Sequence, residues 1–128
     1  MSGVQGGSGW HMAGGAPPDE RGFELVARTE DVPEGALLGV VTSTGERICL
    51  INCNGELYAV RNNCTHQDFP MEDGVLLSDD GCTIECAWHG ARFDCATGAV
   101  KRWPAEDPLP VYELRVEDGG IYVGARKP

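Results

Sequence analysis

Cys64-Thr65-His66 and Cys86-Ala87-Trp88-His89-Gly90 are the two stretches around which this chain of 128 residues is organised. Each stretch contributes one thiol and one imidazole, which are the donors that a four-coordinate soft metal centre requires. The nineteen residues between His66 and Cys86 are enough for the chain to fold two loops toward one point. We therefore predict a metal site whose ligands are Cys64, His66, Cys86 and His89.

The charge of the chain limits its partners. Ten basic residues against 20 acidic ones give a formal charge of −10. Nucleic acids and anionic membranes attract cationic surfaces, so this charge argues against both. The sequence has neither an apolar run of about 18 residues that could span a membrane nor the features of a secretory signal. We expect a monomeric, cytoplasmic protein.

Residues 1–22 differ in composition from the rest of the chain. They are rich in glycine and poor in large apolar side chains, so they cannot bury enough surface to offset the entropy of ordering. This predicts a flexible N-terminal tail at 1–22, followed by one domain at 23–128. We assign no role to His11, which lies in the tail.

From Phe23 onward, short apolar runs separated by turn signals predict an all-β sandwich or barrel of antiparallel strands. Asn54-Gly55 and Asp118-Gly119 supply the positive φ angles of tight hairpin turns. Each Cys–His pair follows a predicted strand, so two hairpin loops would bring the four ligands to one end of the domain. The predicted strands cover 23–27, 37–41, 46–51, 56–60, 75–77, 83–85, 111–116 and 121–123.

Three kinds of site could use the two Cys–His pairs. They could be buried structural residues, or a structural zinc site, although zinc fingers usually take paired cysteines from one segment and paired histidines from another. The mixed order resembles instead the Rieske [2Fe–2S] proteins, in which two cysteines bind one iron and two histidines bind the other. The resemblance extends to Pro70 and Gly74 after the first pair, to the stretch at 90–94, and to Thr97-Gly98.

This resemblance implies a fold and a set of ligands. The fold would be the Rieske-type arrangement of antiparallel sheets, with a cluster-binding subdomain at about 62–104 that is made of two hairpin loops. Cys64 and Cys86 would hold the inner iron of a Rieske-type [2Fe–2S] cluster, and His66 and His89 would hold the outer iron near the surface.

Departures from the family pattern bear on the reduction potential. High-potential Rieske proteins carry an extra cysteine in each cluster loop, and a serine and a tyrosine after the His-Gly pair. Here Trp88 takes the second-loop cysteine position, and Ala91 and Phe93 replace the two hydroxyl donors. Fewer donors to the cluster and an acidic surface both disfavour the reduced state. We expect a midpoint of about −150 mV, at the low end of the Rieske range.

A cluster whose four positions are all filled by protein indicates one-electron transfer and not catalysis. Of the three histidines, only His11 is unassigned, so the chain cannot also hold the mononuclear iron of an oxygenase. The chain resembles the ferredoxin component of ring-hydroxylating, non-haem iron oxygenase systems. This implies transient electrostatic docking with an NAD(P)H-dependent flavoprotein reductase and a terminal oxygenase, with the acidic surface facing basic patches. A Rieske-like small subunit of a nitrite reductase and a zinc-stabilised interaction module remain alternatives.

The other four cysteines, Cys49, Cys53, Cys82 and Cys95, have no pairing pattern. In a reducing cytoplasm we expect small, buried thiols. The segment at 67–85 is longer than in similar ferredoxins, and we expect the extra residues to influence docking.

Overall fold

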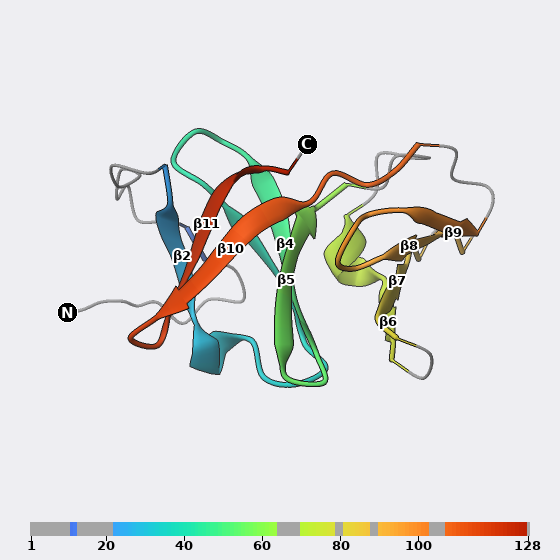
Figure 1. The fold of residues 1–128 in the computed structure, drawn as a ribbon, viewed down its shortest axis with the longest axis horizontal. Helices are drawn as coiled ribbons and strands as arrows, with labels where there is room; N and C mark the ends of the chain where they lie inside the picture. Colours follow the sequence, from blue (N-terminus) through green and yellow to red (C-terminus); the bar gives the residue numbers. More distant parts are fainter. Residues whose placement is uncertain are drawn as a thin grey trace.

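The computed structural model describes residues 11–12, 22–63, 70–78, 81–87, 90–102 and 107–127. These residues form three β-sheets and two short 3₁₀ helices (Figure 1), which confirms the all-β prediction. No helix in these ranges is long and apolar enough to cross a membrane. The elements are β1 His11–Met12, β2 Glu24–Arg28, η1 Thr29–Asp31, β3 Leu37–Val41, β4 Arg47–Cys53, β5 Glu56–Arg61, η2 Met71–Asp73, β6 Val75–Leu77, β7 Thr83–Glu85, β8 Arg92–Asp94, β9 Val100–Arg102, β10 Tyr112–Glu117 and β11 Gly120–Arg126.

The three sheets differ in size and position. The middle sheet has the order β1-β3-β4-β5, the second sheet has the order β10-β11-β2, and the small sheet has the order β6-β7-β8-β9. Figure 1 places the small sheet at the right-hand end of the molecule, apart from the other two. Apart from the short β1–β3 pair, which is parallel, the strand pairings within these sheets are antiparallel.

Strand β4 is buried on both faces because it belongs to two hydrophobic cores. Successive side chains of a strand point to opposite faces. Ile48 and Leu50 therefore pack in the core shared with the second sheet, whereas Cys49 and Ile51 pack in the core shared with the small sheet. The middle sheet thus forms the central layer, and it joins the small sheet to the rest of the domain.

The two predicted hairpin turns are confirmed. Asn54 and Gly55 have φ angles of 58° and 90°, and Asp118 and Gly119 have φ angles of 51° and 77°. Positive φ at both central positions is the geometry of the tight turns that match strand twist. These turns join β4 to β5 and β10 to β11.

Two parts of the structure were not predicted as strands. Strands β8 and β9 are three residues long, and β8 has a single apolar residue, Phe93, between Arg92 and Asp94. In the predicted tail, His11–Met12 pairs with Val40 and Val41 of β3. The rest of that tail, except Gly22, lies outside the described residues.

The expectation that Cys53 and Cys82 are separate thiols is wrong. Their sulfurs form a disulfide bond, with 6.1 Å between the two Cα atoms. Cys53 ends β4 and Cys82 directly precedes β7, so the bond joins the middle sheet to the small sheet. The packing of the two sheets brings together residues that are 29 positions apart.

Candidate metal centre

Cys86 is the one predicted ligand that the described residues include, and it lies where a ligand loop begins. It directly follows β7, and its backbone N–H donates to the Ala91 carbonyl at 2.8 Å, which closes the loop between β7 and β8. Gly90 has a φ of +73°, a conformation that favours glycine. The second predicted ligand loop is therefore a hairpin loop, as expected.

The surroundings of Cys86 suit a thiolate ligand. The residue is 1% exposed and packs in the same core as Met71, Ala91 and Phe93. A thiolate buried among apolar side chains is costly unless a cation neutralises it, which a metal ion does. The other predicted ligands, Cys64, His66 and His89, lie outside the described residues, so their placement stays a prediction.

The first predicted ligand loop connects two of the sheets, and its residues 64–69 lie outside the described residues. It leaves β5 of the middle sheet and returns at η2, which leads into the small sheet. Its two ends are held together by a reciprocal pair of hydrogen bonds. The Asn62 amide donates to Glu72 Oε1 at 2.6 Å, and the Glu72 backbone N–H donates to Asn62 Oδ1 at 3.0 Å. We call this pair the Asn62–Glu72 clamp.

Two glycines lie where a larger residue would not fit. Gly39 lies beside the Asn62–Glu72 clamp, and Gly74 lies at the end of η2. A Cβ atom at Gly39 in β3 would overlap the Glu72 carboxylate and would lie 2.9 Å from Asn62 Nδ2. A Cβ atom at Gly74 would overlap the Glu85 carbonyl. Gly74 belongs to the stretch that resembles the family, whereas nothing in the sequence marks Gly39, Asn62 and Glu72, because their proximity depends on tertiary packing.

Replacing Asn62 with alanine is expected to weaken both the fold and the metal site. The change removes both hydrogen bonds of the clamp and leaves the Glu72 N–H without this acceptor, which costs about 1–3 kcal/mol of unfolding free energy. Asn52→Ala is the matched control, because the Asn52 amide likewise donates one hydrogen bond, to the Val32 carbonyl, and accepts one, from the Gly55 N–H.

Denaturant unfolding and iron content per chain check this expectation. Both variants should lose similar stability, but only Asn62→Ala should also lose iron. Equal iron content in the two variants would mean that the clamp does not support the site.

A row of charged residues borders the second ligand loop. Glu85 on β7 pairs with Arg92 on β8, which in turn pairs with Arg102 on β9. The Glu85 carboxylate lies 2.8 Å from Arg92 Nε and 3.8 Å from Arg102 Nη1. The residue before Cys86 is therefore a carboxylate that two guanidinium groups share.

The thiols of Cys49 and Cys95 lie outside the two predicted ligand loops. Both residues are buried in the core between the middle and small sheets, as predicted. Burial, with a smaller contribution from Asp94, raises the pKa of Cys95 to about 12, and burial also raises the pKa of Cys49. Both thiols therefore stay protonated at neutral pH. Cys82 is held in the disulfide, so it cannot serve as a thiolate ligand while that bond is intact.

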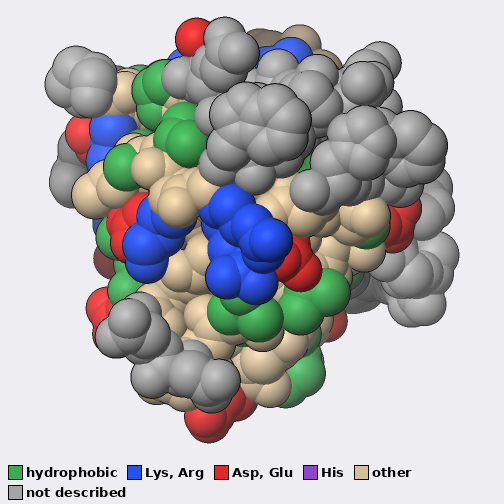
Figure 2. Space-filling view, turned by 90° about the vertical axis from the view of Figure 1, so that its right-hand side faces the viewer, with side chains coloured by type: hydrophobic (Ala, Val, Ile, Leu, Met, Phe, Trp, Pro, Cys, Tyr) green, Lys and Arg blue, Asp and Glu red, His purple; other side chains and the backbone are tan. Residues whose placement is uncertain are grey.

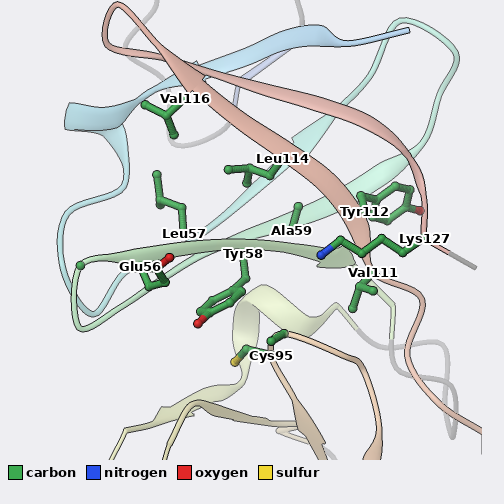
Figure 3. A pocket seen from close by; sticks show the side chains of 12 residues that line it. Glu56, Leu57, Tyr58, Ala59, Cys95, Val111, Tyr112, Leu114, Val116 and Lys127 are labelled. Carbon is green, nitrogen blue, oxygen red and sulfur yellow. The ribbon is translucent and has the colours of Figure 1, made fainter. Parts of the chain in front are cut away.

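A groove of about 430 Å³ opens between β5 and β10, away from Cys86. Figure 3 shows Leu57, Leu114 and Val116 above β5, and Tyr58 and Cys95 below it. The two strands belong to different sheets, and an isolated bridge joins Val60 of β5 to Val111, which directly precedes β10. Glu56 and Cys95 are its only potential metal ligands, and the described residues hold no group of three or more such side chains that could bind a metal ion.

Comparison with known proteins places this chain in a family. The Rieske [2Fe-2S] domain model matches residues 22–113, a range that contains all four predicted ligands. The ferredoxin subunit of 3-phenylpropionate/cinnamic acid dioxygenase from Escherichia coli K12 is 42% identical over 93 residues, which are 73% of this chain and 84% of that protein. The ferredoxin component of the p-cumate 2,3-dioxygenase system from Pseudomonas putida is 40% identical over 96 residues, which are 74% and 79% of the two chains.

The fold is also found in solved structures. A structure of the reduced oxygenase and oxidised ferredoxin of carbazole 1,9a-dioxygenase contains a chain that matches with a TM-score of 0.76 and 27% identity. The match covers 85% of this chain and 99% of that chain. The predicted Rieske-type fold is thus confirmed by a likeness that spans nearly all of the matching protein.

Proposed function

Because this chain belongs to the Rieske [2Fe–2S] family, we propose that it passes single electrons from an NAD(P)H-dependent flavoprotein reductase to a ring-hydroxylating, non-haem iron oxygenase. The family carries a Rieske-type [2Fe–2S] cluster, and the similar sequences are named as ferredoxin components and not as catalytic subunits. The chain is accordingly an electron carrier. The observation that carries the proposal is the match to dioxygenase ferredoxins over about three quarters of the chain.

The proposed ligands divide between the two irons. Cys64 and Cys86 hold the inner iron, and His66 and His89 hold the outer iron. The bound cluster supplies reversible one-electron chemistry. The burial of Cys86 and the apolar side chains of Ala91 and Phe93 support a site that excludes water on its inner side.

The partners are proposed from the names of the relatives. Both similar ferredoxins are named as components of dioxygenase systems, and neither is named as part of a nitrite reductase, which favours an oxygenase as the electron acceptor. The matching solved structure pairs a ferredoxin with its oxygenase. We place this chain in the cytoplasm, where NAD(P)H is available to the reductase, as a monomer that binds each partner transiently.

Spectroscopy and a redox titration test the proposal. The purified protein should be red-brown, should contain two irons and two sulfides per chain, and should bleach with dithionite. The midpoint should lie at about −150 mV, because Ala91 and Phe93 offer no hydroxyl to the cluster. The loaded protein should also support turnover of an oxygenase of this class when a flavoprotein reductase and NADH are present.

Two results would contradict the proposal. A colourless protein with stoichiometric zinc would favour the zinc-stabilised module. A bleachable protein with a clearly positive midpoint would refute the predicted low-potential role.

A further inference from the structure

The exposed face of the small sheet carries a basic patch. Ile84 and Phe93 point into the core and are fully buried, so their neighbours Glu85 and Arg92 point outward. Arg92 and Arg102 share the Glu85 carboxylate, and Lys101 Nζ donates to the neutral Thr83 hydroxyl at 2.8 Å. Figure 2, which faces this end of the molecule, shows Lys and Arg side chains gathered at its centre.

The charge of this sheet is opposite in sign to that of the chain. Strands β6–β9 contain three bases, Arg92, Lys101 and Arg102, and two acids, Glu85 and Asp94. Their formal charge is +1. Because the whole chain carries −10, the remaining residues together carry −11. The Asp94 carboxylate accepts hydrogen bonds from the N–H groups of Ala96 and Thr97, within its own turn. The net charge therefore does not describe the surface beside the second ligand loop.

The basic patch lies beside the second ligand loop. Arg92 follows the loop that the Cys86–Ala91 hydrogen bond closes, and Arg102 lies directly across from it on β9. The Arg92 and Arg102 side chains are 38% and 56% exposed, whereas Glu85 is 22% exposed. The guanidinium groups are thus more accessible to a partner than the carboxylate that they share.

We propose that Arg92, Lys101 and Arg102 form a docking surface for carboxylates on a protein that exchanges electrons with this chain. The proposal rests on the proposed function, because it takes the second ligand loop as the place where electrons enter or leave. A compact acidic patch on a protein fits the small basic area. An extended polyanion such as nucleic acid would meet the −11 of the remaining chain.

The chain offers a matched pair of variants for the test. The side chains of Arg102 and Arg28 are each 56% exposed, and each is paired with one glutamate, at 3.8 Å and 3.5 Å. Arg28 ends β2 in the second sheet. Arg102→Gln and Arg28→Gln therefore each remove one positive charge from the chain, but only Arg102→Gln removes it from the basic patch.

Binding of a fluorescein-labelled tetraglutamate peptide, read by anisotropy at about 10 mM ionic strength, tests the surface without redox chemistry. Arg102→Gln should weaken binding at least about threefold and Arg92→Gln/Lys101→Gln/Arg102→Gln at least about tenfold, while Arg28→Gln should bind as the wild type does. Equal effects of the two single variants would overturn the proposal. So would binding of duplex DNA as tight as that of the tetraglutamate peptide.

Stopped-flow oxidation of the dithionite-reduced protein by ferricyanide gives a second measurement. One electron passes from the reduced cluster to each ferricyanide anion, which becomes ferrocyanide. If the patch lies at the exit, the rate should fall as salt rises, whereas the net charge of −10 alone predicts a rate that rises. A rising rate would count against the docking surface. Absence of dithionite bleaching would instead count against the proposed function, and the anisotropy result would still decide the docking surface.

Discussion

Replacing Cys86 with alanine is expected to abolish the visible absorption of the purified protein and to reduce its iron content to background. Cys86 is buried at the start of the second ligand loop, where its thiolate is the proposed ligand of the inner iron. Alanine offers no donor, and three remaining ligands would leave the inner iron with an open position. Absorption spectroscopy and iron analysis measure the effect directly.

Cys95→Ala is the matched control for this change. Both cysteines are 1% exposed, and both pack in the same core. The Cys95 variant should keep its absorption and iron, because Cys95 lies outside the two predicted ligand loops and is not a proposed ligand. Far-UV circular dichroism should be alike in the two variants. Retention of the visible spectrum by Cys86→Ala would contradict the ligand assignment.

Removing the bond between Cys53 and Cys82 should have the largest effect on stability. A disulfide that closes a loop of about 30 residues restricts the unfolded chain by about 3–4 kcal/mol in the chain-entropy model. The double variant Cys53→Ala/Cys82→Ala should lose about that much unfolding free energy in denaturant titrations, as the wild type should in a thiol reductant. The reductant should have no further effect on the double variant.

Cys49→Ala/Cys95→Ala is the control for the disulfide, because it removes two buried thiols and leaves the bond intact. This variant should remain sensitive to reductant. Thiol counting adds a direct check: of six cysteines, four should react in the unfolded, cluster-free wild type, and all six should react after reduction. Six reactive thiols without a reductant would show that the bond does not form.

Local signals in the sequence predicted much of the fold. Asn54-Gly55 and Asp118-Gly119 marked their hairpins because positive φ is a local requirement. The predicted bounds of β3, β6 and β7 match the structure. Strands β8 and β9 were missed because three residues with one inward side chain give almost no period-2 pattern. Their pairing depends on β7 and on the core beneath them.

The Cys–His spacing predicts the metal ligands. It gives no signal for the disulfide, the Asn62–Glu72 clamp or the basic patch. The disulfide joins positions 29 apart, and the connectivity of cysteines cannot be read from sequence alone. The Asn62–Glu72 clamp depends on space that Gly39 leaves in a neighbouring strand. The basic patch depends on the register of β7, β8 and β9, which sets Arg92 opposite Arg102. The net charge of the chain, −10, is opposite in sign to the charge of this patch.

The Asn62–Glu72 clamp has a consequence for the assembly of the metal centre. Nine residues lie between the two partners, and joining the ends of such a segment has an entropic cost that the clamp meets while the protein folds. The two ends of the segment that carries Cys64 and His66 are therefore already held together when the metal binds. The clamp thereby holds part of the cluster site in place in the folded apo protein. Transfer of a cluster from a donor should therefore be faster into the folded chain than into the unfolded one.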